Sequence, residues 1–88
     1  MKVEVTQEDI ELGVRGRSHL CPISRAIQRK RGVKSASTTP WITNVVRPGR
    51  GLSTYQLPKV ASEFVLAFDT NKPVEPFTFV TKLQGDIQ

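Results

Sequence analysis

The histidine and the cysteine of this chain, one of each, lie two positions apart in the segment SHLCPISRAIQRKRG (residues 18–32). A zinc site needs about four ligands, so His19 and Cys21 cannot form one within a single chain, although an oligomer interface could supply more. A Cys–His nucleophile needs the base within reach of the thiol, and a spacing of two at a helix start points the side chains apart. We therefore interpret Cys21 as a small, half-buried residue at a helix entry and His19 as a polar loop residue. The alternative is that nearby arginines and the helix start lower the thiol pKa and make Cys21 reactive.

Other patterns that serve catalysis are weak. Glu8, Asp9 and Glu11 are close in sequence, but on a short helix they are typical of a solvated face near the positive end of the helix dipole. The loops GVRGRS and RPGRG contain glycine and arginine, yet neither has the spacing of a P-loop or of a dinucleotide-binding turn. We expect no metal, no cofactor and no enzymatic activity.

The net charge of +5 is unevenly distributed. Residues 15–34 carry seven Lys or Arg and no acid, whereas residues 1–14 carry Lys2 against four acids. Such a concentration either faces a polyanion or is balanced within the fold by the acidic N-terminal segment. The sequence leaves both possibilities open.

Three basic segments are predicted to converge on one binding surface. They are a loop, the outer face and end of a helix, and a turn: Arg15 and Arg17; Arg25, Arg29 and Arg31; Arg47 and Arg50. Arginines at a turn beside a sheet are suited to phosphate contacts. Trp41 and Tyr55 could stack on bases, but we expect them to cap the core.

The hydrophobic pattern predicts an α+β domain with a small, mostly antiparallel sheet and two main helices on one face. The first main helix begins at Pro22, ends before Gly32 and buries a stripe of Ile23, Ala26 and Ile27; the second begins at Leu57-Pro58 and buries Val60, Phe64, Ala67 and Phe68. A shorter helix follows a capping box at Thr6, and strands are expected around residues 2–5, 33–39, 41–46, 52–56 and 77–83, with RPGRG as a hairpin turn. Val65 and Leu66 fall outside the second stripe and are a possible protein contact.

Length and composition predict a single domain, residues 1–88. The N-terminus lacks the apolar run of a signal peptide, and no stretch approaches the roughly 20 apolar residues that span a bilayer. We expect a cytoplasmic protein without membrane contact; the sequence does not indicate its oligomeric state.

The order VTQEDIELGVRG and CPISRAI early, followed by YQLPKVASEFVLAFDTNKPVEPFTF late, resembles a group of small uncharacterised proteins encoded by bacteriophages and prophages. The resemblance implies a phage accessory protein in the cytoplasm of a bacterial host. Such proteins are often binders, so we expect a non-enzymatic protein that binds and modulates a host or phage protein. The alternative is a basic nucleic-acid-binding module with phosphate-dominated contacts.

Overall fold

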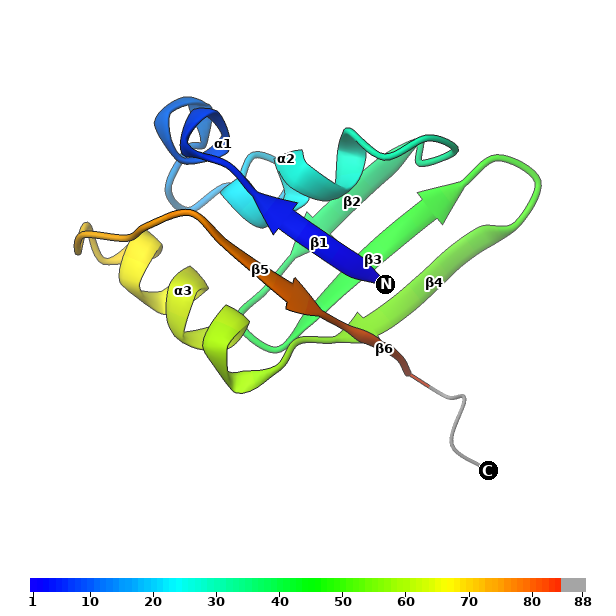
Figure 1. Cartoon of the computed structure of the whole chain (residues 1–88). Coiled ribbons are helices and arrows are strands. Elements are labelled where there is room, and N and C mark those ends of the chain that lie inside the picture. The colour runs from blue at the N-terminus through cyan, green and yellow to red at the C-terminus, as the bar shows by residue number, and fades with distance from the viewer. Residues whose placement is uncertain (85–88) are drawn as a thin grey trace.

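The computed structural model describes residues 1–84. Its elements, in chain order, are β1 (Lys2–Val5), α1 (Gln7–Leu12), α2 (Pro22–Gln28), β2 (Ser35–Thr38), β3 (Ile42–Arg47), β4 (Gly51–Gln56), α3 (Lys59–Asp69), β5 (Phe77–Val80) and β6 (Lys82–Leu83). The predicted α+β class is confirmed (Figure 1).

The two short N-terminal helices begin as the sequence indicates. At α1, the Thr6 hydroxyl accepts a hydrogen bond from the Asp9 amide while the Asp9 carboxylate accepts one from the Thr6 amide, which completes the predicted capping box. Pro22 occupies the first turn of α2, where an amide hydrogen is not needed. The stripe of Ile23, Ala26 and Ile27 is buried, as predicted.

The central part of the chain forms two hairpins by antiparallel pairing. β2 pairs with β3, and β3 pairs with β4 through the predicted RPGRG turn. Gly49 and Gly51 in this turn have φ angles of 76° and 72°, a left-handed conformation that glycine adopts without steric cost. The turn therefore depends on its glycines.

The C-terminal strand segment pairs with strands of two different sheets. Its first part, β5, pairs with β1, and its second part, β6, pairs with β4; only Thr81 separates the two parts. The described residues thus form a two-stranded and a four-stranded antiparallel sheet, and the expectation of one sheet was wrong. Length and alternation predicted the strand at 77–83, but not that its pairing partner changes in the middle.

Helix α2 packs against both β1 and β2. It therefore lies between the N-terminal strand and the free edge of the four-stranded sheet (Figure 1). The core joins side chains from every layer: valines of β1 and β3, the two isoleucines of α2, and the aromatic residues of α3 and β5. On the α3 side, Phe64 packs against Phe77 with ring centroids 4.7 Å apart. The two main helices, α2 and α3, thus both contribute side chains to one core.

Candidate functional site

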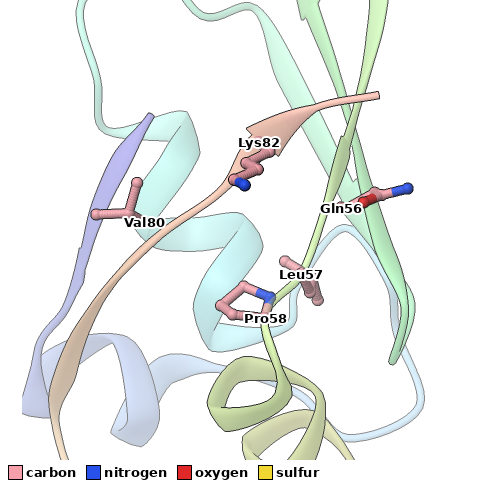
Figure 2. Close-up of a pocket in the computed structure, with 5 residues that line it drawn as sticks. All are labelled: Gln56, Leu57, Pro58, Val80 and Lys82. Carbon is pink, nitrogen blue, oxygen red and sulfur yellow. The ribbon is translucent and has the colours of Figure 1, made fainter. Parts of the chain in front are cut away.

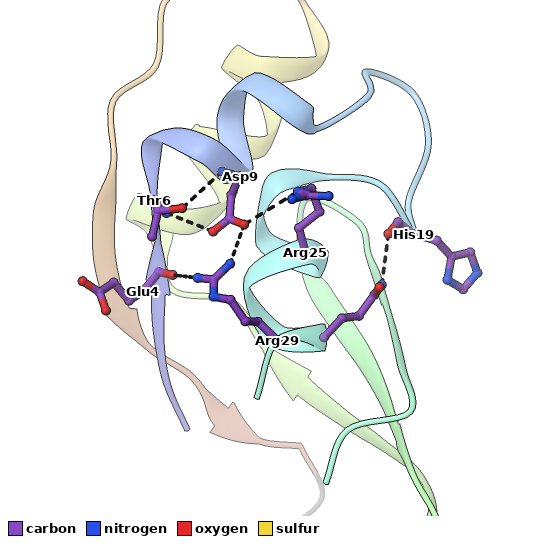
Figure 3. Close-up of polar contacts among 7 residues, drawn as sticks. Glu4, Thr6, Asp9, His19, Arg25 and Arg29 are labelled. Atoms are coloured by element: carbon purple, nitrogen blue, oxygen red, sulfur yellow. Dashed lines mark hydrogen bonds and ion pairs between the residues drawn. The ribbon is translucent and has the colours of Figure 1, made fainter. Parts of the chain in front are cut away.

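A buried carboxylate joins the first two helices. The Asp9 side chain has no exposed surface, and its Oδ1 atom lies 2.6 Å from Nη1 of Arg29 and 3.7 Å from Nε of Arg25 (Figure 3). Arg29 also donates from Nη2 to the backbone carbonyl of Glu4 at 3.0 Å. The two arginines of α2 thereby hold α1 and the end of β1 against the helix.

The protonation states of this cluster follow from its contacts. Burial raises the pKa of Asp9, but hydrogen bonds from Arg29 and Thr6 and the Arg29 charge outweigh burial, so the pKa is below its ordinary value of 3.8. The hydrogen bond to Asp9 raises the already high pKa of Arg29. The pair is therefore charged at neutral pH.

The structure corrects the prediction for Arg25, Arg29 and Asp9. The arginines were expected on a solvated outer helix face and Asp9 on a solvated acidic face, yet they contact one another. Of the two possibilities left open for the basic segment, the acidic N-terminal segment accounts for these two cations. Arg25 and Arg29 are therefore paired within the fold and are not free members of the predicted seven-arginine surface.

The loop arginines lie at one end of β2. The amide of Thr38, at the end of that strand, donates to the carbonyl of Ser18 at 3.1 Å. Arg17 lines a hollow there with Asp69, while the guanidinium of Arg15 donates to the side chain of Asn71. An acidic residue therefore faces this end of the molecule.

The remaining predicted arginines lie at the opposite end of β2. The amide of Lys34, just before the strand, donates to the carbonyl of Val46 at 2.8 Å, and this places the turn after α2 beside the β3–β4 hairpin (Figure 1). We call this region the basic end and define it by four cations: Arg31, Lys34, Arg47 and Arg50. Arg31, Lys34 and Arg50 are exposed, and Arg47 is half-buried with its guanidinium carbon 5.6 Å from the Tyr55 ring centroid.

No salt bridge connects any of these four cations to an acid within residues 1–84. The sequence contains no Asp or Glu between Glu11 and Glu63, and the basic end is built entirely from that stretch. Sequence reasoning did not assign Lys34 to the surface. The absence of acids over residues 12–62, taken together with the hairpin prediction, was the signal that could have identified it.

The two large aromatic residues outside the helices have different environments. Tyr55 is buried, as expected for a core cap, whereas Trp41 is 71% exposed. The expectation that Trp41 caps the core was therefore wrong. Trp41 lies in the turn between β2 and β3, where its carbonyl accepts a hydrogen bond from the Leu57 amide at 2.9 Å.

The buried stripe of α3 is rotated relative to the prediction. Ala61, Phe64, Val65 and Phe68 are buried, whereas Val60 is exposed. Val65 is 2% exposed and cannot be an exposed protein contact, which corrects its assignment; Leu66 is 51% exposed. The buried side of α3 differs from the predicted one because the helix contacts two elements at once. Phe64 packs on Phe77 of β5, and the Ser62 hydroxyl donates to the Pro40 carbonyl in the β2–β3 turn.

The Cys21 side chain is buried, and the His19 side chain contacts a sheet edge. Cys21 is 4% exposed, and burial raises the pKa of its thiol, which favours the unreactive protonated form. Nδ1 of His19 lies 3.1 Å from the carbonyl oxygen of Ala36, on the free edge of β2, and Gln28 donates to the same oxygen. Both contacts cover a sheet edge.

A small hollow lies where β4 leads into α3. Gln56, Leu57, Pro58, Val80 and Lys82 line it, and its volume is about 220 Å³. Figure 2 shows Lys82 above Leu57 and Pro58, Val80 to their left, and the Gln56 side chain pointing away from them. The lining combines three apolar residues with one amide and one cation, and it contains neither a nucleophile nor a carboxylate.

Within the described chain, no group of three or more His, Cys, Asp or Glu could hold a metal ion. None of the helices described for residues 1–84 is long and apolar enough to cross a membrane. Comparison with known proteins found no matching family model, curated protein or solved structure. The resemblance to phage-encoded proteins therefore stays a prediction from the sequence.

Proposed function

We propose that this chain is a non-enzymatic nucleic-acid-binding protein whose basic end contacts phosphates. The observation that carries the proposal is the placement of Arg31, Lys34 and Arg50 in two adjacent loops, all exposed and none paired with an acid within residues 1–84. Phosphate contacts supply most of the affinity of proteins that bind nucleic acid with little sequence preference.

Ion pairs within the protein limit which cations can contact a partner. Asp9 neutralises part of the charge of α2, so the cations left for a partner are those of the loops rather than those of the helix face. Like charges brought together without a counterion repel, and binding a polyanion relieves that repulsion. The protein-docking alternative loses support because one of its two residues, Val65, is in the core.

The proposal also gives an expected location and context. As a nucleic-acid binder, the protein would act in the cytoplasm. If the resemblance to phage proteins holds, that is the cytoplasm of a bacterial host.

The test is a salt titration of binding to labelled DNA and RNA, measured by fluorescence anisotropy. With about four phosphate contacts, log affinity should fall with log salt at a slope of about −3 to −4. The double variant Arg31→Ala, Arg50→Ala should reduce the slope by about two and weaken binding to all sequences alike.

The matched control is Arg15→Ala, Arg17→Ala, which removes the same charge from the other end of β2. Its slope should change by less than that of the basic-end variant. No binding at low salt would contradict the proposal and favour an acidic protein as the partner. Equal effects of the two double variants would contradict the assignment of the phosphate contacts to the basic end.

A further inference from the structure

Trp41 is the large apolar side chain with the greatest exposure among the described residues. Tryptophan is highly buried on average, so an exposed indole beside a sheet needs a reason. It is the single Trp of the chain, and no described aromatic ring stacks on it. Its flat face is available for stacking.

The backbone of Trp41 adjoins a segment that leads into a hollow with apolar walls and a lysine. The Leu57 amide donates to the Trp41 carbonyl, and Leu57 lines the same hollow as Lys82 (Figure 2). The backbone of Trp41 is thus hydrogen-bonded to the segment that enters this hollow, and the indole itself is exposed outside the hollow. A base stacked on an aromatic ring beside a cation is the usual arrangement in proteins that bind single strands.

Strands β3 and β4 connect this region to the basic end. Trp41 precedes the first residue of β3 and Arg47 is its last, a separation of about 20 Å for an extended strand of six residues. Residues 35–46 and 51–58 contain no charged side chain. An outward row across β3 and β4 includes Asn44 and Thr54, whose side chains hydrogen-bond to each other at 2.6 Å. The outer face of these two strands therefore offers polar contacts and no acid that would repel a phosphate chain.

We infer that the nucleic acid is single-stranded, with one base stacked on Trp41 while the backbone reaches the basic end along β3 and β4. This inference rests on the proposed function. In a duplex the base faces are already stacked on their neighbours, so the indole would gain no partner there. A single strand presents free base faces, and stacking tolerates any base.

The experiment uses the full chain and its intrinsic fluorescence. The probe is an oligothymidylate of about 12 nucleotides, within the usual range for a single-strand-binding groove, compared with a duplex of equal length. Binding is measured by anisotropy of a labelled strand and, separately, by quenching of the emission of Trp41. Because the chain has one tryptophan, any quenching reports on this residue.

We expect the single strand to bind more tightly than the duplex and to quench the indole emission. Trp41→Ala should weaken single-strand binding by about 5- to 150-fold, the range for loss of one stacked base, and leave the salt slope unchanged. Trp41→Phe should recover part of that loss. The control Val60→Ala, an exposed apolar residue on α3, should bind like the wild type.

Two kinds of outcome separate this inference from the proposed function. Three results with salt-dependent binding would overturn the single-strand inference and leave the basic end as the site. They are unchanged tryptophan emission, equal affinity of the wild type for single strand and duplex, and equal single-strand affinity of the wild type and Trp41→Ala. An absence of binding to any nucleic acid, with every variant folded by circular dichroism, would overturn both.

Discussion

The carboxylate of Asp9 and the guanidinium of Arg29 form an ion pair with a 2.6 Å contact, between the first turn of one helix and the end of the next. Asp9 is also half of the capping box that starts α1. One side chain therefore fixes both the local structure of its own helix and the position of that helix on α2. The fold of the N-terminal third depends on it.

Replacement of Arg29 by alanine should destabilise the protein. The change leaves Arg25 as the only cation beside the buried Asp9 carboxylate. We expect a loss of about 3 kcal/mol, the lower end for a broken buried pair, because Arg29 is itself partly solvated and the Thr6 amide still donates to Asp9. Urea denaturation followed by circular dichroism measures it. Arg31→Ala, which removes an exposed arginine that forms no ion pair within residues 1–84, is the control and should change stability by less than about 0.5 kcal/mol. Equal stability of both variants would mean that the pair contributes nothing.

Stability should decline in acid through Asp9. Its pKa is lowered in the folded state, so the contribution is complete above the unfolded pKa of about 4 and is lost as pH falls through the folded value. We expect the free energy of unfolding of the wild type to exceed that of Asp9→Asn at pH 6 and the difference to shrink below about pH 4. Urea midpoints at several pH values test this. A constant difference down to pH 2 would show that another group causes the acid loss.

Local patterns predicted the elements well. The capping box at Thr6, the proline at the start of α2 and the glycines of the hairpin turn each act over a few residues, and the structure confirms all three. The environments of Arg25 and Arg29 could not be predicted in this way. Their partner is 16 to 20 residues earlier, and only the packing of α1 on α2 brings the charges together.

The difference between Val65 and Leu66 can be measured directly. Val65→Ala should cost about 1.5 to 3 kcal/mol, because a fully buried valine side chain is lost from the core. Leu66→Ala, one position along the same helix, should cost less than about 0.5 kcal/mol because that side chain is half exposed. Thermal or urea denaturation of the two variants provides the comparison. Equally small costs for both variants would mean that α3 is rotated as the sequence pattern suggested, with Val65 and Leu66 both outside the buried stripe.

That rotation has a physical reason. A helical wheel identifies the apolar side of an isolated helix, and α3 has apolar residues over a wide arc. Which part of the arc is buried depends on neighbours far away in sequence, here Phe77 and the Pro40 carbonyl. Trp41 was misassigned for a similar reason, because residue type predicts average burial and says nothing about a particular turn.

Cys21 should resist alkylation in the folded protein. Its thiol is buried and its pKa is raised, so the reactive thiolate is scarce at neutral pH. We expect iodoacetamide to label the native protein much more slowly than the protein in urea, as followed by mass spectrometry. Rapid labelling of the native protein with retained ellipticity would indicate an accessible, reactive cysteine and would reopen the chemistry of this segment.

The pairing of β1 with β5 determines the order in which the molecule can assemble. Lys2 lies opposite Val80 in the ladder, whereas the β2–β3 and β3–β4 pairs close over a few residues. Short loops close at a smaller entropic cost and sooner than long ones. During synthesis on a ribosome the three central strands can therefore pair first. Val3 and Val5 can pair with β5 only after almost the whole described chain has emerged.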